Sequence, residues 1–243
     1  MNEADQPAIA LAMVQDPILN LAIRYLKDQG FILPLDGCLA RDWCKAQAKL
    51  GIADAQVACG VLLSLGIFGE QDAQAARFWF QSAADQDHPA ALLMLAGLIE
   101  AGSDGDEPNV SGAMALVQRA VEKEYPPALV QIAVDYLNGI NVEEDRNRAL
   151  VYQRKAAMLG EPTGQFLLGA NLLKETDAEA IQEGIHWLEV AAENGCSNAH
   201  RHLAYLFRDG DKGVQQSKER SERHFLVAKK IEDSAGDDFV NPD

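Results

Sequence analysis

The sequence predicts an all-α protein, an α/α superhelical solenoid of about six helix-turn-helix repeats. Three observations predict it: a phrase of small and large apolar residues returns every 35 to 37 residues, each copy has helical spacing, and glycines separate the helices. The phrase starts at five small residues, Ala55, Ala91, Ala128, Gly164 and Ala199. A fixed period of this length is typical of stacked repeats, in which each unit packs against its neighbours.

The first helix of each repeat is predicted from this phrase. In the copy that runs from Ala128 to Leu137, the fifth and sixth residues are Ile132 and Ala133, and Tyr136 follows at the ninth place. The small residues allow a neighbouring helix to approach closely, and the large residues fill the space between the helices. A glycine suited to a left-handed cap then ends the helix in four copies, at Gly66, Gly102, Gly139 and Gly210.

The second helix of each repeat is predicted to begin at a capping residue, Asp72 in one copy and Asp145 in another. It carries a large residue that is followed, four and five places later, by small ones. The clearest examples of the large residue are Trp79, Tyr152 and Trp187. Glycines end this helix at Gly160 and Gly195. Two helices joined by short turns therefore make one hairpin in each repeat.

The predicted solenoid covers residues 19–231, with units that start near 19, 55, 91, 128, 164 and 199. The terminal units are expected to be atypical because they cap the stack. Residues 1–18 are predicted to form an N-terminal leading segment. Residues 232–243 are rich in acidic residues, and we expect them to form a disordered tail.

Charge and composition argue against several classes of partner and location. The chain has 37 acidic and 21 basic residues, and its formal charge of −16 repels nucleic acid and anionic membranes. The amino-terminal residues do not match an export signal, and no apolar run is long enough to cross a bilayer. We therefore expect a cytoplasmic protein that does not insert into a membrane.

The repeats resemble the Sel-one-like repeat family, a relative of the tetratricopeptide repeat. The stretch from Ala128 to Gly160 carries the resemblance best, with its small residue, its apolar-small pair, its tyrosine and its closing Ala-Ala pair and glycine. A second good match runs from Ala199 to Val214. The resemblance implies an α/α solenoid and a role as an adaptor or scaffold instead of a catalyst.

The tetratricopeptide-like geometry places the third, seventh and tenth residues of each first helix on a concave face. The residues predicted to bind a partner there are Val57, Leu93, Val130, Val134, Phe166, Leu173, Arg201, Tyr205 and Arg208. This face suits an apolar helix or peptide whose carboxylate is held by the arginines. In the alternative interpretation, tighter packing of the repeats buries most of these apolar side chains.

The sequence predicts no catalytic residue, no metal ligand and no cofactor. Cys196, His200 and His202 are close in sequence, but no second paired ligand motif accompanies them. The chain also lacks a nucleophile elbow, a phosphate-binding glycine loop and a His-Glu-x-x-His motif. We therefore expect that the protein is not an enzyme.

The predicted function is that of a non-catalytic scaffold or adaptor that binds a protein or peptide partner on its concave face. The alternative is an immunity-type or chaperone-like protein that neutralises a toxin or secreted effector by direct binding, with its acidic surface steering association. Self-association stays open, because the ends of a solenoid can stack. It also stays open whether the concave face or the acidic loops form the main interface.

Overall fold

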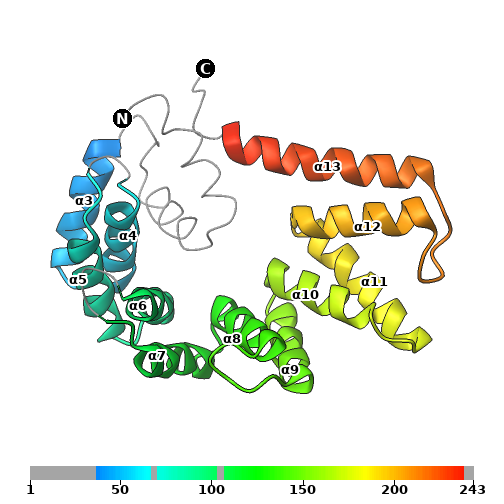
Figure 1. The fold of residues 1–243 in the computed structure, drawn as a ribbon. Helices are drawn as coiled ribbons and strands as arrows, with labels where there is room; N and C mark the ends of the chain where they lie inside the picture. Colours follow the sequence, from blue (N-terminus) through cyan, green and yellow to red (C-terminus); the bar gives the residue numbers. More distant parts are fainter. Residues whose placement is uncertain (1–36, 67–69, 103–106, 238–243) are drawn as a thin grey trace. The chain divides into compact units, whose positions relative to one another are not determined.

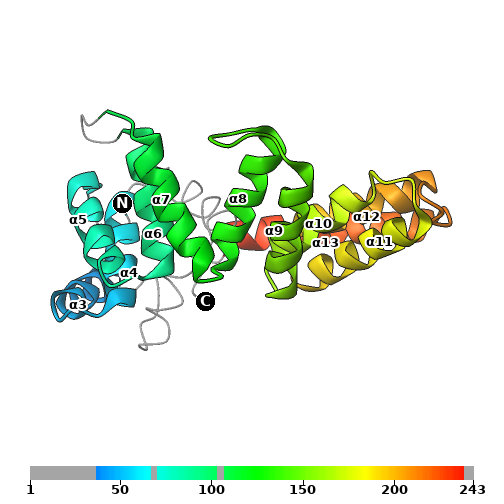
Figure 2. The ribbon, with the colours of Figure 1, turned by 90° about the horizontal axis from the view of Figure 1, so that it is seen from below.

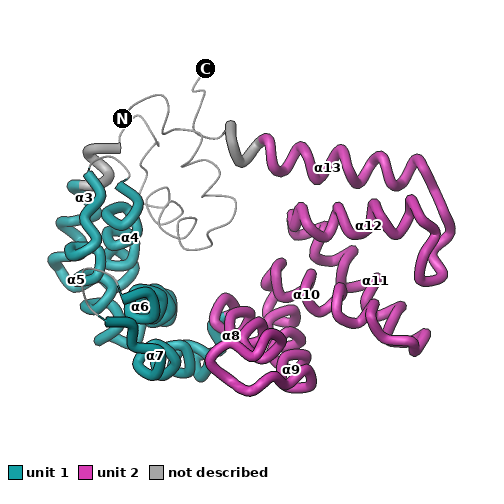
Figure 3. Tube along the Cα trace, in the orientation of Figure 1, with its two compact units in different colours: residues 1–125, 235–243 teal, residues 126–234 magenta. Residues whose placement is uncertain are grey.

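The computed structural model describes residues 37–66, 70–102 and 107–237, and every regular element in these residues is an α-helix (Figure 1). The predicted all-α solenoid is therefore confirmed as the fold class. The leading segment predicted at residues 1–18 lies outside the described residues. The chain divides into two compact units, shown in different colours in Figure 3: unit 1 is residues 1–125 with 235–243, and unit 2 is residues 126–234.

Unit 1 contains five of the described helices. They are α3 (Gly37–Lys49), α4 (Ala53–Ser64), α5 (Ala73–Ala84), α6 (Pro89–Ala101) and α7 (Val110–Glu122). Consecutive helices pack against each other, and Figure 2 shows α6 beside α7. The largest fully buried side chains of this unit are Phe80, Leu92 and Leu95.

Unit 2 contains the other six, the last of them up to Ser234. They are α8 (Pro126–Asn138), α9 (Arg146–Met158), α10 (Pro162–Leu172), α11 (Ala178–Glu193), α12 (Ser197–Asp209) and α13 (Lys218–Asp237). Figure 2 shows α8 beside α9, and α9 also packs against α10. Four fully buried leucines come from α8, α10, α11 and α12: Leu129, Leu168, Leu188 and Leu203.

The helix starts follow the capping chemistry that the sequence predicts. The carboxylate of Asp72 accepts a hydrogen bond from the backbone N–H of Ala75, and that of Asp145 accepts one from Arg148. Each such cap stabilises a helix by about 1 kcal/mol. Both predicted caps are therefore confirmed.

Two first helices end at a glycine in the left-handed region. Gly102 closes α6 and Gly210 closes α12, each with φ of 66°. In this conformation a side chain would clash with the backbone, so glycine is the residue that fits. Both ends agree with the sequence prediction.

Helices α10 and α11 cross at two glycines. A Cβ atom placed on Gly169 would lie 2.8 Å from the carbonyl oxygen of Gly184, and one placed on Gly184 would lie 2.9 Å from the carbonyl oxygen of Gly169. Neither distance is compatible with a real side chain. The small sixth place of the repeat therefore allows contact between two backbones, as the sequence predicts.

The last described helix is longer than the sequence predicts. α13 continues to Asp237, into the segment that was expected to be a disordered tail. An ion pair supports this extension, because the guanidinium of Arg201 on α12 lies 2.6 Å from the carboxylate of Glu232. Residues 238–243 lie outside the described part of the chain.

Candidate functional site

The nine residues predicted to bind a partner divide between the two units. Unit 1 contains two of them, Val57 in α4 and Leu93 in α6. Val57 is fully buried, so its side chain packs inside unit 1, and Leu93 is half-buried. The other seven belong to unit 2.

The apolar members in unit 2 are largely covered. Val130 and Val134 on α8 are half-buried. Leu173, which follows α10, belongs to the buried cluster of α10, α11 and α12, and Phe166 packs against that cluster. The ring of Phe166 also meets His202 edge-on at 6.0 Å between centroids. At Val57 and Leu173 the packing of the repeats thus buries an apolar side chain, as the alternative interpretation expects.

The three members on α12 are exposed and lie close together. Tyr205 is 47% exposed, and its ring meets that of Phe225 of α13 edge-on at 5.3 Å between centroids. The guanidinium of Arg208 lies 4.8 Å from the centre of the Tyr205 ring. These contacts hold the tyrosine in place while leaving much of its ring open to solvent.

Both predicted arginines already bind a carboxylate of the same chain. Arg201 pairs with Glu232, and Arg208 donates two hydrogen bonds of 2.7 and 2.8 Å to Asp209. The hydrogen bonds from Arg208 lower the pKa of Asp209, which keeps this carboxyl ionised. A carboxylate from a partner would therefore have to compete with Glu232 or Asp209.

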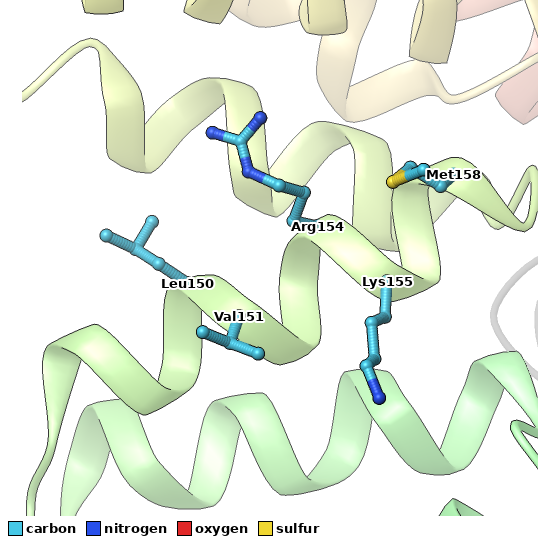
Figure 4. A pocket seen from close by; sticks show the side chains of 5 residues that line it. All are labelled: Leu150, Val151, Arg154, Lys155 and Met158. Atoms are coloured by element: carbon cyan, nitrogen blue, oxygen red, sulfur yellow. The ribbon is translucent and has the colours of Figure 1, made fainter.

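A second exposed surface lies on α9. A pocket of about 260 Å³ is lined by Leu150, Val151, Arg154, Lys155 and Met158 (Figure 4). The exposed fractions of Val151 and Met158 are 55% and 74%. None of these residues was predicted from the sequence, because the tetratricopeptide-like geometry places the binding face on the first helices.

The two cations of this pocket are in different situations. Figure 4 shows their side chains pointing away from each other. Arg154 forms a bidentate ion pair with Glu183 of α11 and thereby lowers the pKa of that carboxyl. Lys155 is exposed and has no acidic partner among the described residues. Arg154 is therefore held by its ion pair, whereas Lys155 is available to pair with a partner.

The histidines near the end of unit 2 form a pair. The Nδ1 atoms of His200 on α12 and His224 on α13 lie 2.9 Å apart, and the His224 ring stacks on Phe207. Burial lowers the pKa of both rings. No group of three or more His, Cys, Asp or Glu side chains in the described ranges is arranged to hold a metal ion. Across the same residues, no helix combines the length and apolar character needed to span a bilayer.

Comparison with known proteins shows a repeat family and a shared fold. A curated protein of uncharacterized function from Neisseria meningitidis serogroup B is 26% identical over 163 residues, which are 67% of this chain and 32% of that protein. The chain thus spans about a third of the length of this relative. The crystal structure of a Sel1 repeat protein from Oxalobacter formigenes matches with a TM-score of 0.74 and 28% identity, over 88% of this chain and 86% of that one.

A third similarity concerns the fold alone. The crystal structure of an immunity protein from Pseudomonas aeruginosa matches with a TM-score of 0.64 and 18% identity, over 93% of this chain and 85% of that one. The family model for the Sel1 repeat matches five consecutive segments, residues 53–88, 89–125, 126–161, 162–196 and 197–230. The chain belongs to the Sel1 repeat family.

Proposed function

We propose that this chain is a non-catalytic scaffold that binds a protein partner on its first helices. Sel1 repeat proteins generally mediate protein–protein interaction. The observation that carries the proposal is the exposed ring of Tyr205, which Arg208 and Phe225 hold in place. Tyrosine and arginine side chains that are fixed before binding supply a large share of the free energy in many interfaces.

The ion pairs on α12 determine how a partner would gain affinity there. A partner carboxylate that reached Arg201 would replace Glu232, so one ion pair would be exchanged for another. Such an exchange between half-exposed groups contributes little net free energy. The contact with Tyr205 would therefore supply more of the affinity than the arginines.

The proposal is tested by placing a photo-crosslinking amino acid at Tyr205 in the full chain. The matched control places it at Gln182, an exposed residue of α11. We expect a protein from the source cell to crosslink at the first position and not at the second, with the partner identified by mass spectrometry. Equal crosslinking at both positions, or at neither, would contradict binding on the first helices.

The identified partner allows a quantitative check. Tyr205→Ala should weaken its binding about 5- to 150-fold, because truncating a central aromatic residue of an interface costs about 1–3 kcal/mol. Gln182→Ala should leave the affinity unchanged. Isothermal titration calorimetry measures both variants.

A second candidate function is the neutralisation of a toxin or secreted effector by direct binding. The formal charge of −16 favours it, because an acidic surface accelerates association with a basic catalytic cleft. The similarity in fold to an immunity protein agrees with this candidate. A toxin encoded beside this chain should lose activity when the purified chain is added, and the association rate should fall as salt rises. A toxin that stays fully active in excess chain would reject the candidate.

A further inference from the structure

Helix α9 departs from the other second helices at one exposed place. The equivalent place lies six residues after the large residue of the repeat, counted from Trp43, Trp79, Leu116, Trp187 and, in α13, His224. The other described repeats carry an exposed charged side chain there, in or directly after the second helix: Lys49, Asp85, Glu122, Glu193 and Lys230. At this place α9 carries Met158, which is 74% exposed. Since the place faces solvent in every repeat, the packing of the fold does not require a methionine there.

The apolar area around Met158 is larger than one side chain. Val151, 55% exposed, and Leu150 line the same pocket, about two turns earlier on α9. Val151 and Met158 are seven residues apart and therefore lie on the same side of the helix. Leu150 is partly buried against the cluster of Ala157, Leu168 and Leu172, and it joins Val151 and Met158 as a lining residue of the pocket. A rimmed apolar stripe that water covers in the free protein is a characteristic contact site for another protein.

The charge of α9 is opposite to that of the whole chain. Between its first and last residues the helix has four cations and no acidic residue, while the chain carries −16. Three of these cations are neutralised within the chain: Arg146 by Glu175, Arg148 by Asp145 and Arg154 by Glu183. Lys155 is the cation beside the apolar stripe that keeps no acidic partner among the described residues.

We propose that the α9 stripe, formed by Leu150, Val151 and Met158, docks an acidic amphipathic segment of another protein. An apolar side chain of that segment enters the pocket, and a neighbouring carboxylate pairs with Lys155. Charge complementarity identifies the occupant, because a neutral or basic segment would leave Lys155 unpaired or repelled. This inference rests on the proposed function and adds a contact on the second helices.

The test selects a library of short random peptides on the full chain and sequences the peptides that bind. We expect enrichment of peptides that combine leucine or phenylalanine with aspartate or glutamate. In fluorescence anisotropy, Lys155→Glu and Met158→Glu should each weaken these peptides more than about tenfold, and added salt should weaken them further. Lys229→Glu makes the same charge change on the exposed face of α13 and should alter the affinity about twofold or less.

The other outcomes overturn the inference. Enriched peptides that are neutral or basic, or that bind Met158→Glu as well as the original chain, show that α9 is not the docking site. A library that yields no binders also contradicts the proposal. So does concentration-dependent self-association that Met158→Glu abolishes, because the occupant of the stripe is then a second copy of this chain. Crosslinking at Tyr205 is measured independently, so the scaffold function can stand when the α9 proposal fails.

Discussion

Gln56 and Gln165 make the same two hydrogen bonds at the same place in two different repeats. The side-chain amide of Gln56 donates to the carbonyl of Ala48 at 3.2 Å and accepts from Gln86 at 2.8 Å. That of Gln165 donates to the carbonyl of Ala157 at 3.2 Å and accepts from Asn194 at 2.9 Å. Each buried glutamine therefore links its own first helix to the ends of the second helices before and after it.

Replacing Gln165 by leucine should cost less stability than replacing it by alanine. Leucine already fills this place, fully buried, in two other repeats, at Leu92 and Leu129. Gln165→Ala leaves a cavity and removes both side-chain hydrogen bonds, so it should lower the free energy of unfolding by about 2–4 kcal/mol. Gln165→Leu keeps the volume and should cost about 1 kcal/mol. Urea denaturation measures both, and equal losses would contradict this explanation.

Gly169→Ala should destabilise unit 2 by at least about 2 kcal/mol, because the new methyl group meets the carbonyl of Gly184 and the side chain of Leu188. Gly97→Ala is the control. A Cβ atom there meets nothing within 4 Å, so this change should stabilise the helix by up to about 1 kcal/mol. Opposite shifts in the urea midpoint are expected, and a neutral Gly169→Ala would show that α10 and α11 do not touch at this crossing.

The packing of α13 on α12 should weaken in mild acid. Burial lowers the pKa of His200 and of His224, and repulsion by His200, Arg220 and Arg223 lowers that of His224 further. Below the ordinary histidine pKa of about 6.5, the unfolded chain therefore binds more protons than the folded chain, so stability falls as pH falls. His224→Phe keeps a ring against Phe207. Its melting temperature should fall less between pH 7.5 and pH 5 than that of the original chain. An identical loss in both proteins would exclude the histidine pair as the cause.

Thiol labelling of the folded protein should separate the described cysteines. Cys44 and Cys59 are buried, while Cys196 is partly exposed. Burial raises the pKa of the Cys196 thiol, which slows its reaction without preventing access. We expect mass spectrometry to find Cys196 modified first, and Cys44 and Cys59 only after urea is added. Rapid labelling of Cys44 in the native protein would contradict its packing between α3 and α4.

The fold could be predicted from the sequence because the repeats share the same helix caps, small residues and spacing of apolar residues. Asp72 and Asp145 cap helices as expected, and Gly169 provides the close approach that a small residue predicts. The glutamine links were not predicted, because Gln56 and Gln165 interrupt the apolar pattern and their partners lie on other helices. A pattern search treats such residues as exceptions.

The candidate site was harder to predict than the fold. Whether Arg201 is available depends on Glu232, which belongs to a segment that the sequence assigned to a disordered tail. Val57 occupies the same place in its repeat as the exposed Arg201, and only three-dimensional packing shows that Val57 is covered. Met158 could have been recognised by aligning the second helices, since a methionine replaces the charged residue found in the others.

At the crossing of Gly169 and Gly184, a larger residue at one position cannot be compensated by a smaller residue at the other. In an ordinary core contact, an enlarged residue can be accommodated by shortening its neighbour. Here each residue abuts the main chain of the other, and neither has anything left to remove. A substitution at either position could be accommodated only if a whole helix moved. We therefore expect both glycines to be among the residues that vary least among homologues.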